Sequence, residues 1–383
     1  MVFPSRCSSP GPLVWKRREF LRLASACTVN SVLLPSLPMR AAGSIGGKKV
    51  VVVTFGGGAR DEETFGPDGH ENIPWLLKTL LPQSTFFGQV VNRGILGHYV
   101  ATTSLATGVY ETFNNFSGVA PPHPTLFEYF RRDLRRPAHD AWLISPSNGF
   151  RNMGGSTARK YGPEFGASVL LPKQLLQAAS PGHGAGSIDR LLRDTYEEPH
   201  ISGGATGETE LRQIENILRF SRDEFVQHAL SMDSADELSV YVAHQLMLQV
   251  APSLLWITLH DIDVAHSGAF SLYIDGIQRT DRLCVDIWKN IQANPEYSGK
   301  TTMFVLPDFG RDSDTDPGGN SFQHHRTGDA ASRTTWMMVL GPGVREGVFV
   351  QRAVESIDLV PTIGKILGIS TALAEGRVLS EVA

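Results

Sequence analysis

The chain has 383 residues, a formal net charge of −4 and 41% hydrophobic residues. This length is enough to bury a sizeable core, and it suits one large α/β domain or two ordinary ones. Because contacts to nucleic-acid phosphates need clustered lysine and arginine, a mildly acidic chain is a poor partner for DNA or RNA. We therefore exclude nucleic-acid binding.

Residues 1–43 are typical of a twin-arginine export signal. Arg17-Arg18 precede a moderately apolar stretch that ends near Pro38, and small residues follow it. Polar residues and proline interrupt this stretch, whereas a spanning helix needs about 20 mostly apolar residues. We expect a periplasmic or secreted protein with no stable membrane span. The leader holds six basic residues and one acid, so the remainder carries a charge of −9.

Only Cys284 lies beyond this leader, so no internal disulfide is expected there. A lone cysteine in an apolar helical stretch is predicted to be a buried apolar side chain.

Residues 44–383 predict one α/β domain in which strands alternate with helices. The run Val50–Val53 is β-branched throughout, as in a strand that is buried on both faces of a parallel sheet. Strands are expected at 48–55, 141–144, 253–259, 302–306 and 336–340. Helices are expected at 73–81, 124–132, 209–225, 235–250, 270–291 and 357–367. The helical stretch from about 184 to 250 is predicted to be an insertion on the sheet, with a simple crossover as the alternative.

Polar clusters follow several of these strands, at the edge where open α/β sheets place their functional groups. His260, Asp261, Asp263 and His266 follow the strand 253–259, and two carboxylates with two imidazoles suit a divalent metal. The alternative is a turn in which Asp263 caps the next helix. Asp308 follows the strand 302–306 and is a candidate ligand or an Asx-turn residue. Arg311 is expected to meet an anionic substrate or to form a surface salt bridge.

Two further segments complete the candidate site. His324 and His325 lie in a polar loop before the strand 336–340, and adjacent histidines point in different directions, so at most one is expected to join Asp263. The alternative is a solvated pair. The segment 97–108 is rich in small and hydroxyl residues and is expected to form a helix with His98 near its start. The glycines at 56–58 permit close approach of an anion, but their spacing excludes a nucleotide-binding loop.

Taken in order, these motifs resemble the alkaline phosphatase, sulfatase and phosphodiesterase superfamily. The segment 358–362, Asp-Leu-Val-Pro-Thr, is similar to the Asp-x-x-Pro-Thr near the end of sulfatase-like enzymes. In those enzymes a Leu-Gly pair and a Gly-x-x-Leu motif follow, and they resemble Leu367-Gly368 and residues 376–379 here. The turn 341–343, Gly-Pro-Gly, also resembles the family. So do Leu105–Gly108 and the helix that starts with Pro124-Thr125.

The resemblance implies an alkaline-phosphatase-like fold, a mostly parallel sheet sandwiched by helices, with two divalent metals and a covalent intermediate. It places one metal on Asp263, His266 and His324 or His325, and it places His98 at the nucleophile position. The expected cofactor is therefore one or two ions of zinc, manganese, magnesium or calcium.

The sequence departs from the family pattern at the second metal. Gly56 stands where a carboxylate is expected, and Phe309 stands where a histidine follows Asp308. Substitute ligands at 61–63, or a hydroxyl nucleophile among residues 102–104, remain open alternatives. We expect a metal-dependent hydrolase of phosphate or sulfate esters, acting on a small anionic ester or a cell-surface glycan. The alternatives are a non-catalytic exported binding protein and a carbohydrate transferase on the same fold.

Overall fold

The β-branched run Val50–Val53 forms the middle of strand β1 (Lys49–Thr54), which pairs in parallel register with β5 (Leu254–Thr258) and β6 (Thr301–Leu306). The structure is a computed structural model that describes residues 47–180, 187–192, 205–315, 321–326 and 328–382. Residues Ile45–Ala383 form one compact unit. The export signal expected at 1–43 lies outside the described residues.

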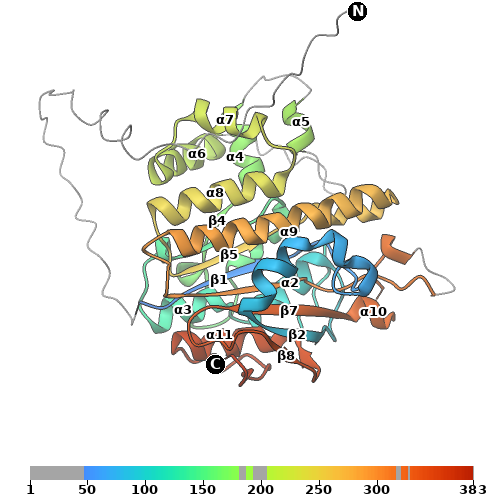
Figure 1. The fold of residues 1–383 in the computed structure, drawn as a ribbon. Coiled ribbons are helices and arrows are strands. Elements are labelled where there is room, and N and C mark those ends of the chain that lie inside the picture. The colour runs from blue at the N-terminus through green and yellow to red at the C-terminus, as the bar shows by residue number, and fades with distance from the viewer. Residues whose placement is uncertain (1–46, 181–186, 193–204, 316–320, 327, 383) are drawn as a thin grey trace, which may run out of the picture. The chain divides into compact units, whose positions relative to one another are not determined.

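The sheet has nine strands in the order β4-β3-β5-β1-β6-β7-β2-β8, and β9 pairs with β2 (Figure 1). The remaining strands are β2 (Ser84–Val91), β3 (Ala141–Ile144), β4 (Ser168–Leu170), β7 (Thr334–Leu340), β8 (Val348–Val350) and β9 (Val354–Glu355). Among these strands only β7 runs antiparallel to its neighbours β6 and β2. The predicted mostly parallel α/β sheet is therefore confirmed.

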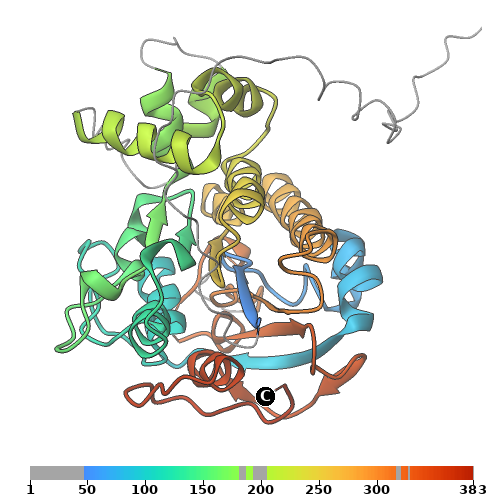
Figure 2. The same cartoon turned by 90° about the vertical axis from the view of Figure 1, so that its left-hand side faces the viewer.

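Helices cover both faces of the sheet, because alternate residues of β1 enter two separate cores. Val51 and Val53 belong to the core under α8 (Ala235–Gln249) and α9 (Phe270–Ala293). Val50 and Val52 belong to the core under α3 (Leu126–Asp133) and α11 (Leu359–Leu367). Figures 1 and 2 show these helices on opposite sides of the strands. Each valine buried in this way contributes about 1.5–3 kcal/mol of transfer free energy.

The helices match the expected ones with two differences. The stretch expected as one helix at 209–225 is two helices, α6 (Ala205–Leu218) and α7 (Arg222–Leu230). The break is at Arg219, whose φ of 54° is left-handed, and Ser221 then caps α7 together with Glu224. The helix expected at 73–81 is present as a continuous but irregular helical run, in which a π-helix, Leu76–Leu80 (η2), is followed by a 3-10 turn, Leu81–Gln83 (η3). The strand β2 that follows it was missed because Gly88 and Gln89 interrupt its apolar pattern.

The other α-helices of the described residues are α2 (His98–Thr107), α4 (Pro172–Ala179), α5 (Ser187–Leu192) and α10 (Ala330–Arg333). Helix α4 packs against α6 and α7, and Figure 1 shows these helices gathered beyond α8. The helix α2 confirms the one expected at 97–108. Cys284 is fully buried in α9, as predicted. No helix among the described residues has the length and apolar character to cross a bilayer.

Glu128, in the first turn of α3, ties this helix to the loop that follows β3. Its fully buried carboxylate accepts hydrogen bonds from the backbone N–H and hydroxyl of Thr125 at 2.7 and 2.9 Å. It also accepts bonds from the N–H and hydroxyl of Ser156 at 3.1 and 2.8 Å and from the N–H of Gly162 at 2.8 Å. A buried acceptor for five donors is a strong local constraint.

We expect Glu128→Gln to lower the free energy of unfolding by about 3 kcal/mol, because the new amide NH₂ faces hydrogen-bond donors. Urea unfolding measures this as a lower midpoint with an unchanged slope. The exposed Glu375→Gln is the control and is expected to change stability by less than about 0.5 kcal/mol. Equal midpoints for the two variants would contradict the role of Glu128.

Candidate metal centre

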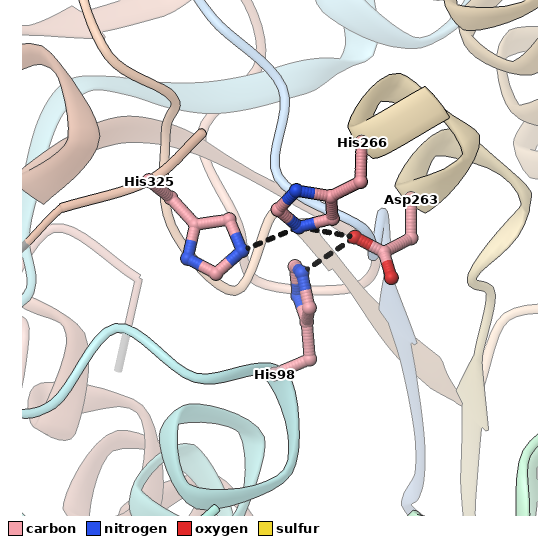
Figure 3. Close-up of side chains that lie close together, drawn as sticks. All are labelled: His98, Asp263, His266 and His325. Atoms are coloured by element: carbon pink, nitrogen blue, oxygen red, sulfur yellow. Dashed lines mark hydrogen bonds and ion pairs between the residues drawn. The ribbon is translucent and has the colours of Figure 1, made fainter. Parts of the chain in front are cut away.

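Four side chains from three separate parts of the chain meet at one point (Figure 3). His98 opens α2, and His325 lies in the loop before α10. Asp263 and His266 lie in a short 3-10 helix, Asp261–Ser267 (η7), directly after β5. Each side chain offers one ligand atom, and these four atoms all lie within 4.8 Å of one another.

The separations of the four atoms suit one small ion. Nε2 of His98 lies 2.8 Å from Oδ1 of Asp263, and Nε2 of His266 lies 3.2 Å from the same oxygen. Nε2 of His266 is 2.9 Å from Nε2 of His325. Ligand atoms that each lie about 2.0–2.2 Å from a tetrahedral ion are separated from one another by about 3.3 Å. Only small outward movements are therefore needed to seat one ion among them.

Hydrogen bonds on the far side of two imidazoles point their lone pairs inward. Nδ1–H of His98 donates to Oδ2 of Asp308 at 2.6 Å, and Nδ1–H of His325 donates to the carbonyl oxygen of Leu96 at 2.7 Å. A proton held on Nδ1 leaves the Nε2 lone pair free for a metal, which is the usual arrangement in histidine metal sites. Asp308 is therefore outside the group of four ligands and contacts one of them, His98, by a hydrogen bond.

The electrostatics of the cluster favour a cation at its centre. Nε2 of His98 is buried, and among the described residues it has no partner with hydrogen-bond geometry, although Asp263 is close. Burial lowers the pKa of His98, but the carboxylates of Asp263 and Asp308 outweigh it and raise the pKa to about 9, so Nε2 also carries a proton that a metal would have to displace. Burial, together with the charges of His98 and Arg311, lowers the pKa of His325 to about 2, so this imidazole is neutral. A neutral imidazole is the form that binds a metal.

The 3-10 conformation of η7 explains the spacing of three between Asp263 and His266. Side chains at positions i and i+3 of a 3-10 helix eclipse one another, so both residues face the same point. Gly268, at a φ of 78°, ends this helix in a left-handed conformation. A spacing of four, as in the resembling family, would suit an α-helical turn instead.

The positions that depart from the family pattern are filled by tight local contacts. A Cβ atom on Gly56 would lie 2.1 Å from the backbone oxygen of Leu259. The buried ring of Phe309 stacks on the imidazole of His98, with centroids 4.6 Å apart. Neither residue offers a ligand atom, and position 56 has no room for a side chain without a shift of backbone.

Arg311 is fully buried behind Asp263. Its Nη2 donates to Oδ1 of Asp263 at 3.0 Å and also to the carbonyl oxygen of Gly57. Its Nε donates to the carbonyl oxygens of Gly57 and Gly58 at 3.0 and 2.8 Å, and its Nη1 donates to that of Phe322 at 3.1 Å. The salt bridge that Arg311 forms with Asp263 is therefore buried inside the protein, whereas a surface salt bridge was expected. The contact of Arg311 with an anionic substrate stays a prediction.

The other candidates lie outside the group of four. The ring of His324 is 5.8 Å from that of His266, centroid to centroid. Glu63 pairs with Arg60, its Oε2 accepting a bond from Nε at 2.8 Å. The expected alternatives at 61–63 are absent from the one group of possible metal ligands that the described residues form. The hydroxyls of Thr103 and Ser104 donate to carbonyl oxygens of their own helix at 2.6 and 2.8 Å.

Two further groups shape the centre. Nε2 of His260, directly before η7, lies 3.4 Å from Oδ2 of Asp263. The carbonyl oxygen of Leu96 orients His325. His260 belongs to the polar cluster that the sequence predicted after this strand, whereas a backbone carbonyl leaves no signal in the sequence.

We expect Gly56→Asp to lower the free energy of unfolding by about 3 kcal/mol, because the new side chain meets backbone at 2.1 Å. Calorimetric unfolding measures the loss. The control is Gly155→Asp, where the backbone is extended and the nearest atom to a Cβ lies 3.6 Å away. A Gly56→Asp variant with unchanged stability and a second bound ion would contradict this reading.

Comparison with solved structures defines the fold class. The chain is similar to the phosphonate monoester hydrolase of Agrobacterium radiobacter, with a TM-score of 0.53 and 14% identity over 88% of this chain and 77% of that one. It is also similar to the wild-type alkaline phosphatase PafA, with a TM-score of 0.51 and 11% identity over 88% and 99% of the two chains. These identities show a shared fold and no more.

A third similar structure is the lipoteichoic acid synthase LtaP from Listeria monocytogenes, with a TM-score of 0.51 and 12% identity over 88% of this chain and 75% of that one. No family model and no curated protein matches the sequence. The chain therefore has an alkaline-phosphatase-like fold, as the sequence motifs implied.

Proposed function

We propose that this chain is an exported metal-binding protein on the alkaline phosphatase fold, and that it holds one divalent ion between His98, Asp263, His266 and His325. The single observation that carries the proposal is the convergence of four ligand atoms within 4.8 Å. The outward hydrogen bonds of His98 and His325 support it, because they direct both Nε2 atoms to the inside.

One ion, not two, suits the residues present. The described residues form a single group of possible ligands. The guanidinium of Arg311 is a fixed positive charge 3.0 Å from Asp263, so it disfavours a further cation on that side. Three imidazole nitrogens and one carboxylate oxygen favour zinc or another transition metal over magnesium and calcium, which prefer oxygen ligands.

The arrangement is that of a closed site. Structural zinc sites use four protein ligands, whereas catalytic sites keep one position for water or substrate. Here His98 takes the fourth position, and the side chains of His98 and Asp263 are each only 7% exposed. An ion bound there acts as a Lewis acid. His98 and Asp263 would hold it from the buried side, and the half-buried His266 and His325 would hold it from the other.

We predict that the purified protein binds one equivalent of Zn²⁺ and that His325→Ala weakens this binding by about 100-fold or more, since even residues behind the ligands contribute about 10–100-fold. Competition with a chromogenic chelator measures the dissociation constant. His324→Ala is a matched control, because it removes an adjacent imidazole outside the group of four. The proposal fails if both variants bind as the unaltered protein does, or if that protein binds no ion.

A second candidate function is the hydrolysis of phosphate or sulfate esters with His98 as nucleophile. The Asp308–His98 hydrogen bond favours it, because a carboxylate on Nδ1 makes Nε2 more nucleophilic. In this case Nε2 forms the bond to phosphorus or sulfur, the ester oxygen leaves, and water then releases the group from His98. The substrate would be a small anionic ester or a cell-surface glycan.

Turnover of 4-nitrophenyl phosphate, bis(4-nitrophenyl) phosphate and 4-nitrophenyl sulfate by the zinc-loaded protein separates the two candidates. The closed site predicts no turnover above that of His98→Gln. Turnover that His98→Gln abolishes and His324→Ala preserves would establish the hydrolase and overturn the closed site.

The twin-arginine leader supports export of an already folded protein, consistent with an ion loaded before export. We expect replacement of Arg17 and Arg18 by lysine to retain the protein in the cytoplasm, because the paired arginines are what the export route reads. Cell fractionation of the producing bacterium measures this. Export that continues unchanged would contradict the assignment of residues 1–43.

A further inference from the structure

A buried carboxylate from another element holds the loop that carries two of the four ligands. Asp236, in the first turn of α8, is fully buried. Its Oδ1 and Oδ2 accept the backbone N–H of His260 at 2.8 and 2.9 Å. Its Oδ2 also accepts the N–H of Asp261 at 2.8 Å.

These two N–H groups belong to the start of η7. The first N–H groups of any helix have no partner inside the helix, and a side chain just before the helix normally supplies one. His260, at that position in η7, makes no such side-chain bond to the helix. Asp236 therefore caps η7 from a distance of 24 residues along the chain.

A second element fixes the same turn. Nη1 of Arg279, in α9, donates to Oδ2 of Asp261 at 3.1 Å. Helices α8 and α9 thus hold the start of η7, and the next turn of η7 presents Asp263 and His266. The direction of both ligands depends on where this turn begins.

We propose that Asp236 is a positioning residue for the metal centre: it sets the ligand loop in its binding conformation before an ion arrives. The helical segment between β4 and β5, which has no ligand in the group of four, then contributes to metal affinity through this one side chain. This inference rests on the proposed metal site.

The chain contains a matched control in Asp281 of α9, which is also fully buried. Its carboxylate accepts the N–H of Trp75 at 3.0 Å and that of Leu76 at 2.6 Å, at the start of η2. Asp281 thus makes the same kind of cap on a short helix that carries none of the four ligands.

The test compares Asp236→Asn with Asp281→Asn. In both, the new amide NH₂ faces a backbone N–H, so both variants lose thermal stability in the absence of metal. Zn²⁺ dissociation constants, from chelator competition, are expected to rise about 10–100-fold in Asp236→Asn and less than about twofold in Asp281→Asn. An unchanged constant in Asp236→Asn, or an equal rise in both variants, overturns the proposal.

Hydrogen exchange on the unaltered protein tests the proposal even if Asp236→Asn fails to fold. We expect the amides of His260 and Asp261 to exchange slowly in the metal-free protein, because Asp236 holds them already, and to slow by less than about threefold with Zn²⁺. Fast exchange that zinc alone suppresses would show that the ion orders the loop, and it would overturn the role of Asp236. Absence of zinc binding would instead defeat the proposed metal site.

Discussion

The carboxylate of Asp263 is the interaction on which the rest of the centre depends. Oδ1 is approached by His98, His266 and Arg311, and Oδ2 is approached by His260. Burial alone would raise the pKa of Asp263, but the charges of His98 and His260, with hydrogen bonds from His266 and His98, hold this pKa well below its usual value. A buried charge is tolerated only with such compensation. The same convergence that stabilises the carboxylate also gathers the nitrogen ligands around one point.

The fold alone suggests ester hydrolysis, whereas the residues of the site favour metal binding, and we give the site more weight. Among the structures this chain resembles are a hydrolase and a phosphatase, but similar folds host unrelated functions. Backbone contacts leave Gly56 no room for a carboxylate, and Phe309, whose ring stacks on His98, offers no ligand atom. What remains is an acid and three imidazoles around a single position. This is why we place metal binding before ester hydrolysis.

Much of the fold could be predicted from local pattern, because buried parallel strands such as β1 are continuous β-branched runs. The Asp263–His266 pair was predictable for the same reason, since it directly follows such a strand. The positions of Arg311 and Asp236 were not, because their partners lie 48 and 24 residues away along the chain. His98 was predicted as a nucleophile, and only the three-dimensional structure shows its Nε2 directed at Asp263 and its Nδ1 at Asp308.

X-ray absorption at the zinc edge of the fully loaded protein tests the central claim most directly. Four ligands from His98, Asp263, His266 and His325 predict three nitrogens and one oxygen at about 2.0–2.2 Å from a single zinc ion. A shell made mainly of water oxygens, or a second metal at about 3.5–4 Å as in two-metal hydrolases, would contradict the claim of one closed site.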